Sequence, residues 1–192
     1  MEIKIATIKD NFCQIAELIY ETDSYIYPSA FTDKQHAIST LTEMIKSQTI
    51  FNYNNCLVAT INDQIVGLVV FVSKKTSSSN NYDKWISHSK ELSHMIKNYI
   101  YKVEKEQKDN TVELVCVCIK KQYRRQKIAT KLINHLFLAH QQSNFQLYTL
   151  QNNFSAINLY KSLGFSISQE AKGYNSFRKR KPKVYFMTKN KE

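Results

Sequence analysis

The sequence predicts a single α/β domain over residues 1–192, built on a mixed central sheet that is flanked by helices. Segments of strand length and segments of helical periodicity alternate along the chain in the order β-α-α-β-β-α-β-α-β-α-β-β. A chain of 192 residues is long enough for one domain with a full core and short for two. The sequence contains no internal repeat and no linker that would divide it.

The first half of the chain predicts a strand, two helices and a β-hairpin. Apolar and polar residues alternate over residues 2–7, and Thr7 with Asp10 resembles a capping box that begins a first helix. An aromatic loop, broken at Pro28, separates that helix from a second one over residues 33–47. Two apolar strands, CLVATI and IVGLVVFV, then flank a short Asn-Asp turn, which is the pattern of a hairpin.

The second half alternates helices and strands. A polar loop and a long charged helix over residues 83–107 precede an apolar strand over residues 112–119. A helix that begins with TKLINHL leads to a strand over residues 146–151, and a further helix over residues 153–163 ends at Gly164. FSISQ and VYFMT are the last two strands, and the basic segment FRKRKPK lies between them.

The composition excludes several classes of protein. No apolar run approaches the roughly 20 residues of a membrane helix, and the N-terminus lacks the apolar core of a signal peptide. The cysteines and histidines show no metal-ligand spacing. Cys116 and Cys118 lie two apart on a predicted strand, so both should point to one face as small core residues. We therefore expect a cytoplasmic protein without disulfides or a metal site.

The formal net charge of +11 allows three interpretations. It fits a nucleic-acid partner, an acidic partner, or an anionic cofactor on a protein with a soluble surface. Much of the charge is scattered along the chain, but two basic clusters stand out, at residues 120–127 and 177–183. The sequence has no recognisable helix-turn-helix, zinc-finger or RNA-binding motif, so the charge is weak evidence for nucleic acid.

Residues 112–133 carry the clearest functional signal. An apolar strand runs into a short basic loop, and the loop opens directly into an amphipathic helix. Backbone N–H groups at the start of a helix have no partner within the helix and carry the positive end of its dipole. Arg124, Arg125 and Lys127 add formal charge around those groups. The arrangement predicts a binding site for a phosphate or pyrophosphate.

Two motifs follow one another in this half of the chain. The basic loop reads R/Q-x-x-G-x-G/A with one departure, Lys127 in place of the middle Gly, in Arg124-Arg125-Gln126-Lys127-Ile128-Ala129. A strand is then followed by N-x-x-A-x-x-x-Y-x-x-x-G-F, which is matched by Asn153, Ala156, Tyr160, Gly164 and Phe165. With the N-terminal strand and helix, these motifs resemble the GNAT superfamily of acetyl-CoA-dependent N-acetyltransferases over nearly the whole chain.

The resemblance implies a mostly antiparallel sheet whose fourth and fifth strands splay apart, with acetyl-CoA, the acetyl donor, in the gap. The fourth strand would contact the cofactor at Val117, Cys118 and Ile119, and the Val117 N–H would polarise the thioester carbonyl. The pyrophosphate site would be formed by Arg124, Arg125, Gln126, Lys127, Ile128, Ala129 and Thr130. Asn153 and Tyr160 would complete the cofactor site. Because a helix-initiating residue does not need a positive φ, we expect Lys127 to be tolerated.

The same resemblance implies two catalytic residues. Tyr160 would protonate the departing thiolate, since a phenol with an ordinary pKa of about 10 suits that role. The alternative is a core aromatic residue at helical spacing. Glu113 lies where some family members hold the general base that deprotonates the amine. Its alternatives are a solvated glutamate at a strand end and a proton relay through ordered water.

The acceptor wall is expected near the end of the first helix, as in other family members. Acidic and aromatic residues alternate there and would suit a cationic amine; they are Glu17, Glu21, Asp23, Tyr20, Tyr25 and Tyr27. The alternative is an exposed acidic helix end with core tyrosines. The inserted helix before the fourth strand either shapes this pocket or joins two copies in a homodimer.

The resemblance therefore implies direct acetyl transfer to a primary amine, without a covalent enzyme intermediate. The resemblance does not specify the acceptor, which ranges in this family from a small amine to a peptide N-terminus or a protein lysine. Lys127 at a glycine position favours one alternative, a catalytically inactive acyl-CoA-binding regulatory module. A nucleic-acid-binding protein is a second alternative, which predicts steeply salt-dependent binding.

Overall fold

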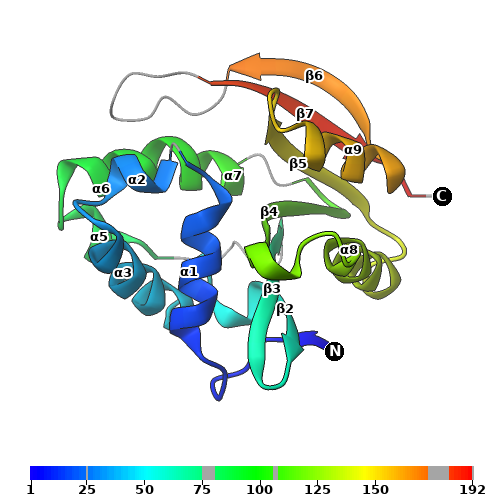
Figure 1. Cartoon of the computed structure of the whole chain (residues 1–192). Coiled ribbons are helices and arrows are strands. Elements are labelled where there is room, and N and C mark those ends of the chain that lie inside the picture. Colours follow the sequence, from blue (N-terminus) through cyan, green and yellow to red (C-terminus); the bar gives the residue numbers. More distant parts are fainter. Residues whose placement is uncertain (25, 75–80, 106–107, 173–181, 192) are drawn as a thin grey trace.

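The computed structural model describes residues 1–24, 26–74, 81–105, 108–172 and 182–191, and these residues form a seven-stranded sheet (Figure 1). The strand order is β1-β2-β3-β4-β5-β7-β6, and all neighbours are antiparallel except β4 and β5. The strands are β1 (Glu2–Ile5), β2 (Cys56–Ile61), β3 (Gln64–Ser73), β4 (Thr111–Ile119), β5 (Asn144–Leu150), β6 (Ser166–Lys172) and β7 (Lys183–Lys189). The mixed, mostly antiparallel sheet predicted from the sequence is confirmed.

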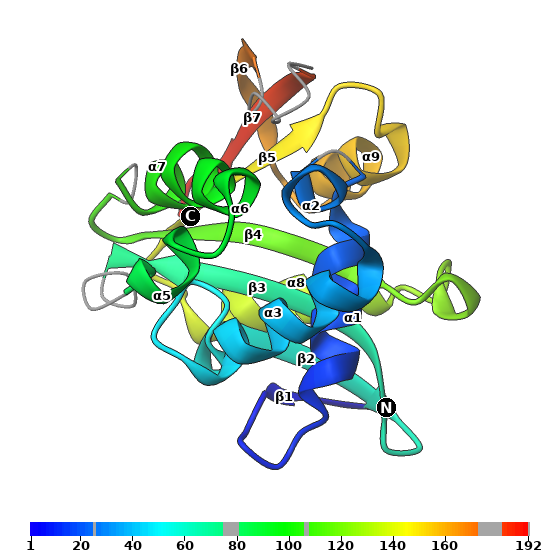
Figure 2. The same ribbon diagram turned by 90° about the vertical axis from the view of Figure 1, so that its left-hand side faces the viewer.

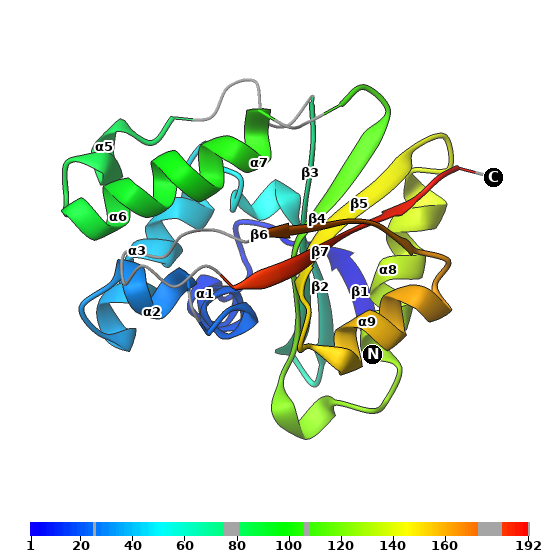
Figure 3. The ribbon, with the colours of Figure 1, turned by 90° about the horizontal axis from the view of Figure 1, so that it is seen from above.

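Helices cover both faces of the sheet (Figures 2 and 3). One layer holds α1 (Phe12–Thr22), α2 (Ile26–Ala30), α3 (Lys34–Lys46) and the α5 to α7 segment, and the other holds α8 (Ile128–Ala139) and α9 (Phe154–Ser162). Two 3-10 turns, η1 (Tyr53–Asn55) and η3 (Lys121–Tyr123), precede β2 and α8. A cluster of buried apolar side chains lies beneath each layer, as burial of one face of each helix requires.

The predicted hairpin is present as β2 and β3. Its two turn residues, Asn62 and Asp63, have φ values of 49° and 59°. Both angles are in the left-handed region, which Asn and Asp enter more readily than other side chains. This is the backbone of a type I′ turn, whose twist matches that of the paired strands.

The start of the first helix differs from the expectation. Asp10 accepts hydrogen bonds from the backbone and hydroxyl of Thr7, at 2.7 and 2.9 Å, but these close a turn and cap no helix. The helix begins after Asn11, whose side chain accepts from the Gln14 N–H at 3.2 Å. The predicted capping box was wrong because Asn11, a better N-cap, lies closer to the first apolar residue of the helix.

The aromatic loop around Pro28 also differs, because it contains the short helix α2. Pro28 lies in the first turn of that helix, where its missing N–H removes no helical hydrogen bond. Asp23 accepts from the Ile26 N–H at 2.6 Å and fixes the start of the helix. The chain thus turns sharply after α1, and α2 lies at the end of that helix, where it packs against α6 (Figure 2).

The long helix predicted over residues 83–107 is broken. The structure has α5 (Asp83–Ile86), α6 (Lys90–Met95), a π-helical turn η2 (Ile96–Ile100) and α7 (Tyr101–Lys105). Ser89 starts a new helix because its hydroxyl accepts from the Leu92 N–H at 3.0 Å. Residues 106–107 lie outside the described part of the chain, as do residues 75–80 of the polar loop and 177–181 of the basic segment.

Gly67 on β3 sets the position of α8. A Cβ at Gly67 would lie 2.7 Å from the Ile119 side chain, 3.1 Å from Ile128 and 3.2 Å from Leu132. Only a residue without a side chain lets the first turn of α8 pack this closely on the strand. The basic loop is therefore held against the end of β4.

A β-bulge in β4 shapes the strand where it approaches the functional site. Val70 on β3 pairs with Cys116 and Phe71 pairs with Leu114, so Val115 is the extra residue.

Cys116 and Cys118 are both buried in the cluster beneath α1 and α3, as the sequence predicted. All four cysteines are free thiols. Among the described helices, none has the length and apolarity needed to cross a membrane.

Candidate active site

The two parallel strands diverge at the centre of the sheet. β4 and β5 pair over four residues each, from Thr111 with Asn144 to Leu114 with Leu147, and their register ends there. β5 continues alongside β7, while β4 continues alongside β3, so the two strands splay apart (Figure 3). The splayed strands that the resemblance implied are present.

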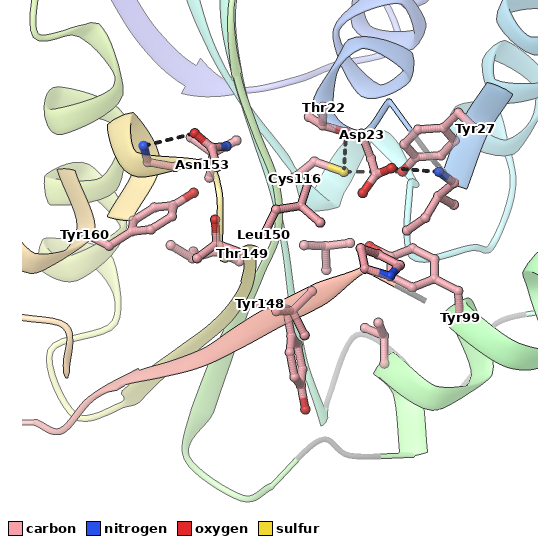
Figure 4. Close-up of a pocket in the computed structure, with 18 of the residues that line it drawn as sticks. Thr22, Asp23, Tyr27, Tyr99, Cys116, Tyr148, Thr149, Leu150, Asn153 and Tyr160 are labelled. Carbon is pink, nitrogen blue, oxygen red and sulfur yellow. Dashed lines mark hydrogen bonds between the residues drawn. The ribbon is translucent and has the colours of Figure 1, made fainter. Parts of the chain in front are cut away.

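A cavity of about 170 Å³ opens at this divergence (Figure 4). It is bounded by β4 and β5, by the end of α1, by η2 and by α9. Its lining in the described residues consists of Thr22, Asp23, Ile26, Tyr27, Asn98, Tyr99, Val103, Leu114, Val115, Cys116, Val117, Tyr148, Thr149, Leu150, Asn153, Ala156, Tyr160, Lys172, Pro182 and Val184. Elements far apart in the sequence therefore meet around one cavity.

The bulged part of β4 forms one wall. The Cys116 sulfur shares a hydrogen bond with the Tyr27 hydroxyl at 3.5 Å, and the Thr22 hydroxyl lies 3.6 Å from it. Burial raises the pKa of the Cys116 thiol to about 11, because a thiolate would lose its hydration there. At neutral pH this residue is a protonated thiol. Val117 lines the cavity one residue further along.

Helix α9 forms a second wall with the second sequence motif. Asn153 is its N-cap, and the Asn153 side chain accepts from the Ala156 N–H at 3.2 Å. One face of the helix then brings Ala156 and Tyr160 to the cavity. Tyr160 is 7% exposed, and its ring lies 5.8 Å from that of Phe165 in an edge-on arrangement. Burial, with a smaller contribution from Cys116, raises the pKa of Tyr160 well above its ordinary value.

The end of α1 and the η2 turn form a third wall. Asp23 and Tyr27 reach the cavity from the α1–α2 corner, and Asn98 and Tyr99 reach it from the π-helical turn (Figure 4). Burial is also the main cause that raises the pKa of Tyr99, with added repulsion from Cys116, Asp23 and Glu113. This wall is more polar and more aromatic than the β4 wall.

The predicted anion site lies at the start of α8. Arg124, Arg125, Gln126 and Lys127 are all exposed, and the Lys127 side chain makes no capping hydrogen bond to the helix. The Arg124 Nε donates to the Ile119 carbonyl at 3.0 Å, which ties the loop to the end of β4. The loop thus presents several cations beside the free amides of a twelve-residue helix.

Lys127 corrects the expectation about the backbone of this loop. Its φ is 58°, so the residue that replaces glycine adopts a left-handed conformation. Arg125 does the same, with a φ of 66°. The expectation that a helix-initiating residue needs no positive φ was wrong at Lys127, because this residue is the N-cap and the turn closes through it. This left-handed backbone explains why the motif has a glycine at this position. In this chain a lysine adopts the same backbone conformation, at some conformational cost.

Glu113 lies away from the cavity lining. It is 2% exposed, and its Oε2 accepts from the Gln146 Nε2 at 2.8 Å across the paired part of β4 and β5. It is a buried carboxylate held by a neighbouring amide, so it is not the solvated strand-end glutamate that was one alternative. Any proton that it accepts from the cavity has to travel through water or another side chain.

The structure gathers some of the predicted site residues and separates others. Val117, Asn153 and Tyr160 meet at one cavity, whereas Cys118 and Ile119 are buried off its lining. The loop and helix start form a second group beyond the end of β4. This group contains Arg124, Arg125, Gln126, Lys127, Ile128, Ala129 and Thr130, of which Ile128 is buried against β3 and Ala129 and Thr130 are half-buried.

Two of the six residues expected to form an acceptor wall line the cavity. Asp23 and Tyr27 line the cavity, Glu17, Glu21 and Tyr20 do not, and Tyr25 lies outside the described residues. Sequence reasoning missed Asn98, Tyr99 and Tyr148 as lining residues. Asn98 and Tyr99 carried no motif, and the only signal for Tyr148 was its place on the strand before the second motif.

Comparison with known proteins agrees with this geometry. Residues 52–167 match the family model of the acetyltransferase (GNAT) domain, and the chain belongs to this family. It is therefore an acyltransferase of a family that uses acetyl-CoA as the acyl donor. No curated protein matches the chain in sequence.

Several solved structures share the fold. An N-acetyltransferase from Staphylococcus aureus Mu50 is 21% identical with a TM-score of 0.73, over 98% of this chain and 100% of that one. A ribosomal-protein-alanine N-acetyltransferase from Brucella melitensis is 18% identical with a TM-score of 0.61, over 99% of each chain. The PaiA N-acetyltransferase from Thermoplasma acidophilum, in complex with coenzyme A, is 15% identical with a TM-score of 0.58, over 98% of each chain. At these identities the likeness shows a common fold.

Proposed function

We propose that this acetyltransferase moves the acetyl group of acetyl-CoA directly to a primary amine, with Tyr160 as the general acid. The observation that carries the proposal is that Tyr160 and the bulged part of β4 line one cavity where β4 and β5 diverge. In the balanced reaction a C–N bond forms, the C–S bond breaks, and the sulfur leaves as a thiol. The ammonium form of the acceptor gives up two protons, one to the sulfur and one to solvent.

The residues around the cavity fit acetyl-CoA as the donor, which supplies an activated thioester. The register of β4 and β5 ends at Leu114 and Leu147, which leaves the rest of β4 beside the cavity. The Val117 N–H would stabilise charge on the carbonyl oxygen. The exposed cationic loop at residues 124–127, with the first amides of α8, would hold the diphosphate. Asn153 would contact the cofactor from the start of α9.

Tyr160 holds a proton at the place where a leaving sulfur would need one. Burial disfavours its phenolate, so the hydroxyl stays protonated throughout the neutral range and can donate. Removing that hydroxyl leaves the ring and its packing on Phe165 in place, so the role can be tested without disturbing the core.

The acceptor must lose a proton before it attacks, because an alkylammonium with a pKa of about 10.4 has no free electron pair. Glu113 is our candidate base, acting through water, and Gln146 would orient its carboxylate. A relay through ordered water alone is the alternative. The cytoplasmic location expected from the sequence remains part of this proposal.

Calorimetric titration with acetyl-CoA, with desulfo-CoA as a non-reactive control, tests the donor. Saturable binding of both, followed by amine-dependent release of thiol and formation of the acetylated amine by mass spectrometry, would support the proposal. Binding without transfer to any amine would favour the inactive regulatory module. An absence of binding would contradict the cofactor site.

A further inference from the structure

We propose that the acceptor is a short aliphatic amine that carries a second cationic group, and that Asp23 binds this second cation. The inference rests on the proposed amine acetylation and narrows its acceptor. The proposed cation site lies at the wall of the cavity opposite α9, where the α1–α2 corner meets η2 (Figure 4).

Asp23 is held in a fixed position at this wall. It follows the last residue of α1, and its Oδ1 accepts from the Ile26 N–H at 2.6 Å, at the start of α2. This hydrogen bond to the first turn of a helix holds the carboxylate in place. Asp23 is the one carboxylate among the described residues that line the cavity.

The charge of Asp23 acts across the cavity. Its repulsion contributes to the raised pKa of Tyr99 on η2 and to that of Cys116 on β4, although burial is the larger cause for both. Two separate walls therefore face the same negative field. A cation in the space between them would be attracted, and a second anion would be repelled.

Aromatic rings surround the same space. Tyr27, Tyr99 and Tyr148 line the cavity from α2, η2 and β5 (Figure 4). The faces of aromatic rings attract ammonium groups, and their edges pack against methylene chains. A fixed carboxylate among tyrosine rings is the combination that favours an alkylammonium over a neutral or anionic group.

Lys172 is the one positively charged residue among the described residues that line the cavity. It does not reverse the preference of the cavity for an alkylammonium group. It is the last residue of β6 and is exposed, so water screens its charge. Asp23 is half-buried, and its field is screened less. Among the described lining residues, the negative charge therefore lies deeper in the cavity than the positive charge.

Hydrogen bonds hold the α5 to α7 segment in place beside this wall. Tyr82 donates to Glu104 at 2.7 Å and accepts from the Ile50 N–H at 2.9 Å, which ties α7 to the loop before β2. The π-helical turn η2 lies between α6 and α7 and carries Asn98 and Tyr99 to the cavity. Such turns are often found at functional sites, because the extra residue redirects side chains that an α-helix would point elsewhere.

The size of the cavity fits a small acceptor. Its volume of about 170 Å³, part of which the thioester would occupy, is less than the roughly 300–1,000 Å³ of pockets that hold drug-sized molecules. A short chain that ends in one charged group fits this space, whereas a longer acceptor would extend through the open side of the cavity.

Three acceptors of matched length test the proposal: 1,4-diaminobutane, 1-aminobutane and 4-aminobutanoate. Steady-state thiol release from acetyl-CoA should give the highest kcat/KM with the diamine and the lowest with the amino acid, whose second group is an anion. Asp23→Asn keeps a side chain that can cap α2 but removes the charge. It should lower kcat/KM for the diamine by roughly tenfold to a hundredfold, as loss of a charged partner does, and change that for 1-aminobutane by less than about threefold.

Asp33→Asn is the matched control. Asp33 caps α3 by accepting from the His36 N–H at 2.8 Å, but it is exposed and does not line the cavity. This variant should behave as the wild type with all three acceptors. Equal effects of the two substitutions, or a higher kcat/KM for 4-aminobutanoate than for 1,4-diaminobutane, would overturn the proposed acceptor class.

Direct titration of the diamine separates this proposal from the proposed function. If no amine is acetylated, transfer itself fails, and calorimetry with 1,4-diaminobutane still measures the cation site. Binding that Asp23→Asn abolishes and Asp33→Asn retains would support the site. An absence of diamine binding to the wild type would overturn it.

Discussion

The Tyr27 hydroxyl and the Cys116 sulfur lie 3.5 Å apart, which joins the short helix α2 to the bulged part of β4. Both side chains are buried, and both line the cavity. The contact therefore links the wall proposed to bind the acceptor with the strand proposed to stabilise the oxyanion.

Removing this contact should cost little stability but should weaken the binding of the acceptor amine. In Tyr27→Phe the Cys116 thiol loses one partner, so we expect a loss of about 1 kcal/mol in the free energy of unfolding. The KM for the amine should rise, while the Kd for acetyl-CoA should change by less than about twofold. Urea denaturation and calorimetry measure the two effects, and an unchanged KM would contradict the link between these walls.

The thiols of Cys13 and Cys116 should differ sharply in their reactivity toward an alkylating reagent. Burial raises the pKa of Cys116 to about 11, and an alkylating reagent reacts with the thiolate. At pH 7.5 iodoacetamide should therefore modify Cys13, which is exposed, and leave Cys116 intact. Mass spectrometry of tryptic peptides gives the order of modification. Labelling of Cys116 before Cys13 in the folded protein would contradict the enclosed cavity.

Lys127 offers a test of the basic loop. In Lys127→Val a β-branched residue must adopt the left-handed backbone that Lys127 has at φ 58°. We expect a loss of roughly 1 kcal/mol in stability and a Kd for acetyl-CoA raised about tenfold. Lys127→Gly accepts the same backbone without strain and loses only the charge, so its Kd should stay within about threefold. Equal Kd values for the two variants would show that backbone conformation at this position is unimportant.

Gly67 should tolerate little side-chain volume. Its Cβ would lie 2.7 Å from the end of the Ile119 side chain, which can rotate, so Gly67→Ala should cost about 1 kcal/mol. The branched side chain of Gly67→Val would also meet Ile128 and Leu132, and should cost about 2–3 kcal/mol and weaken acetyl-CoA binding by displacing α8. Urea denaturation compares the two, and a Gly67→Val variant as stable as the wild type would contradict the close packing of α8.

The pH dependence of kcat should reflect the raised pKa of Tyr160. A general acid is active in its protonated form, so activity falls only as pH rises through its pKa. Because burial raises that pKa above its ordinary value of about 10, kcat should show no descending limb up to pH 10. A descending limb near pH 8 or 9 in the wild type would point to a different acid.

Most of the fold, and the places of Asn153 and Tyr160 at the cavity, could be predicted because they depend on local patterns. The Asn153 to Phe165 spacing identified a helix with Tyr160 on its inner face, and the structure has Asn153 as its N-cap. The turn at Asn62 and Asp63 was equally local. Such features are set by neighbouring residues, so the sequence shows them directly.

The features of the site that the sequence did not indicate depend mostly on contacts between distant segments. Asn98 and Tyr99 appear in the sequence as two residues of a charged helix, and nothing there indicates a π-helical turn or its position beside β4. The left-handed Lys127 was missed for a different reason. The glycine in the motif already indicated a positive φ, but the lysine was judged by the ordinary preference of its residue type.

The central claim is that Tyr160 donates a proton during acetyl transfer in this cavity, and one substitution tests it most directly. Tyr160→Phe removes only the hydroxyl, and Tyr53→Phe is a control at a tyrosine that stacks on Phe12 away from the cavity. We predict that Tyr160→Phe lowers kcat by about 10²- to 10⁴-fold, with a Kd for acetyl-CoA within about twofold of the wild type. An unchanged kcat for Tyr160→Phe, equal to that of the control, would contradict the account.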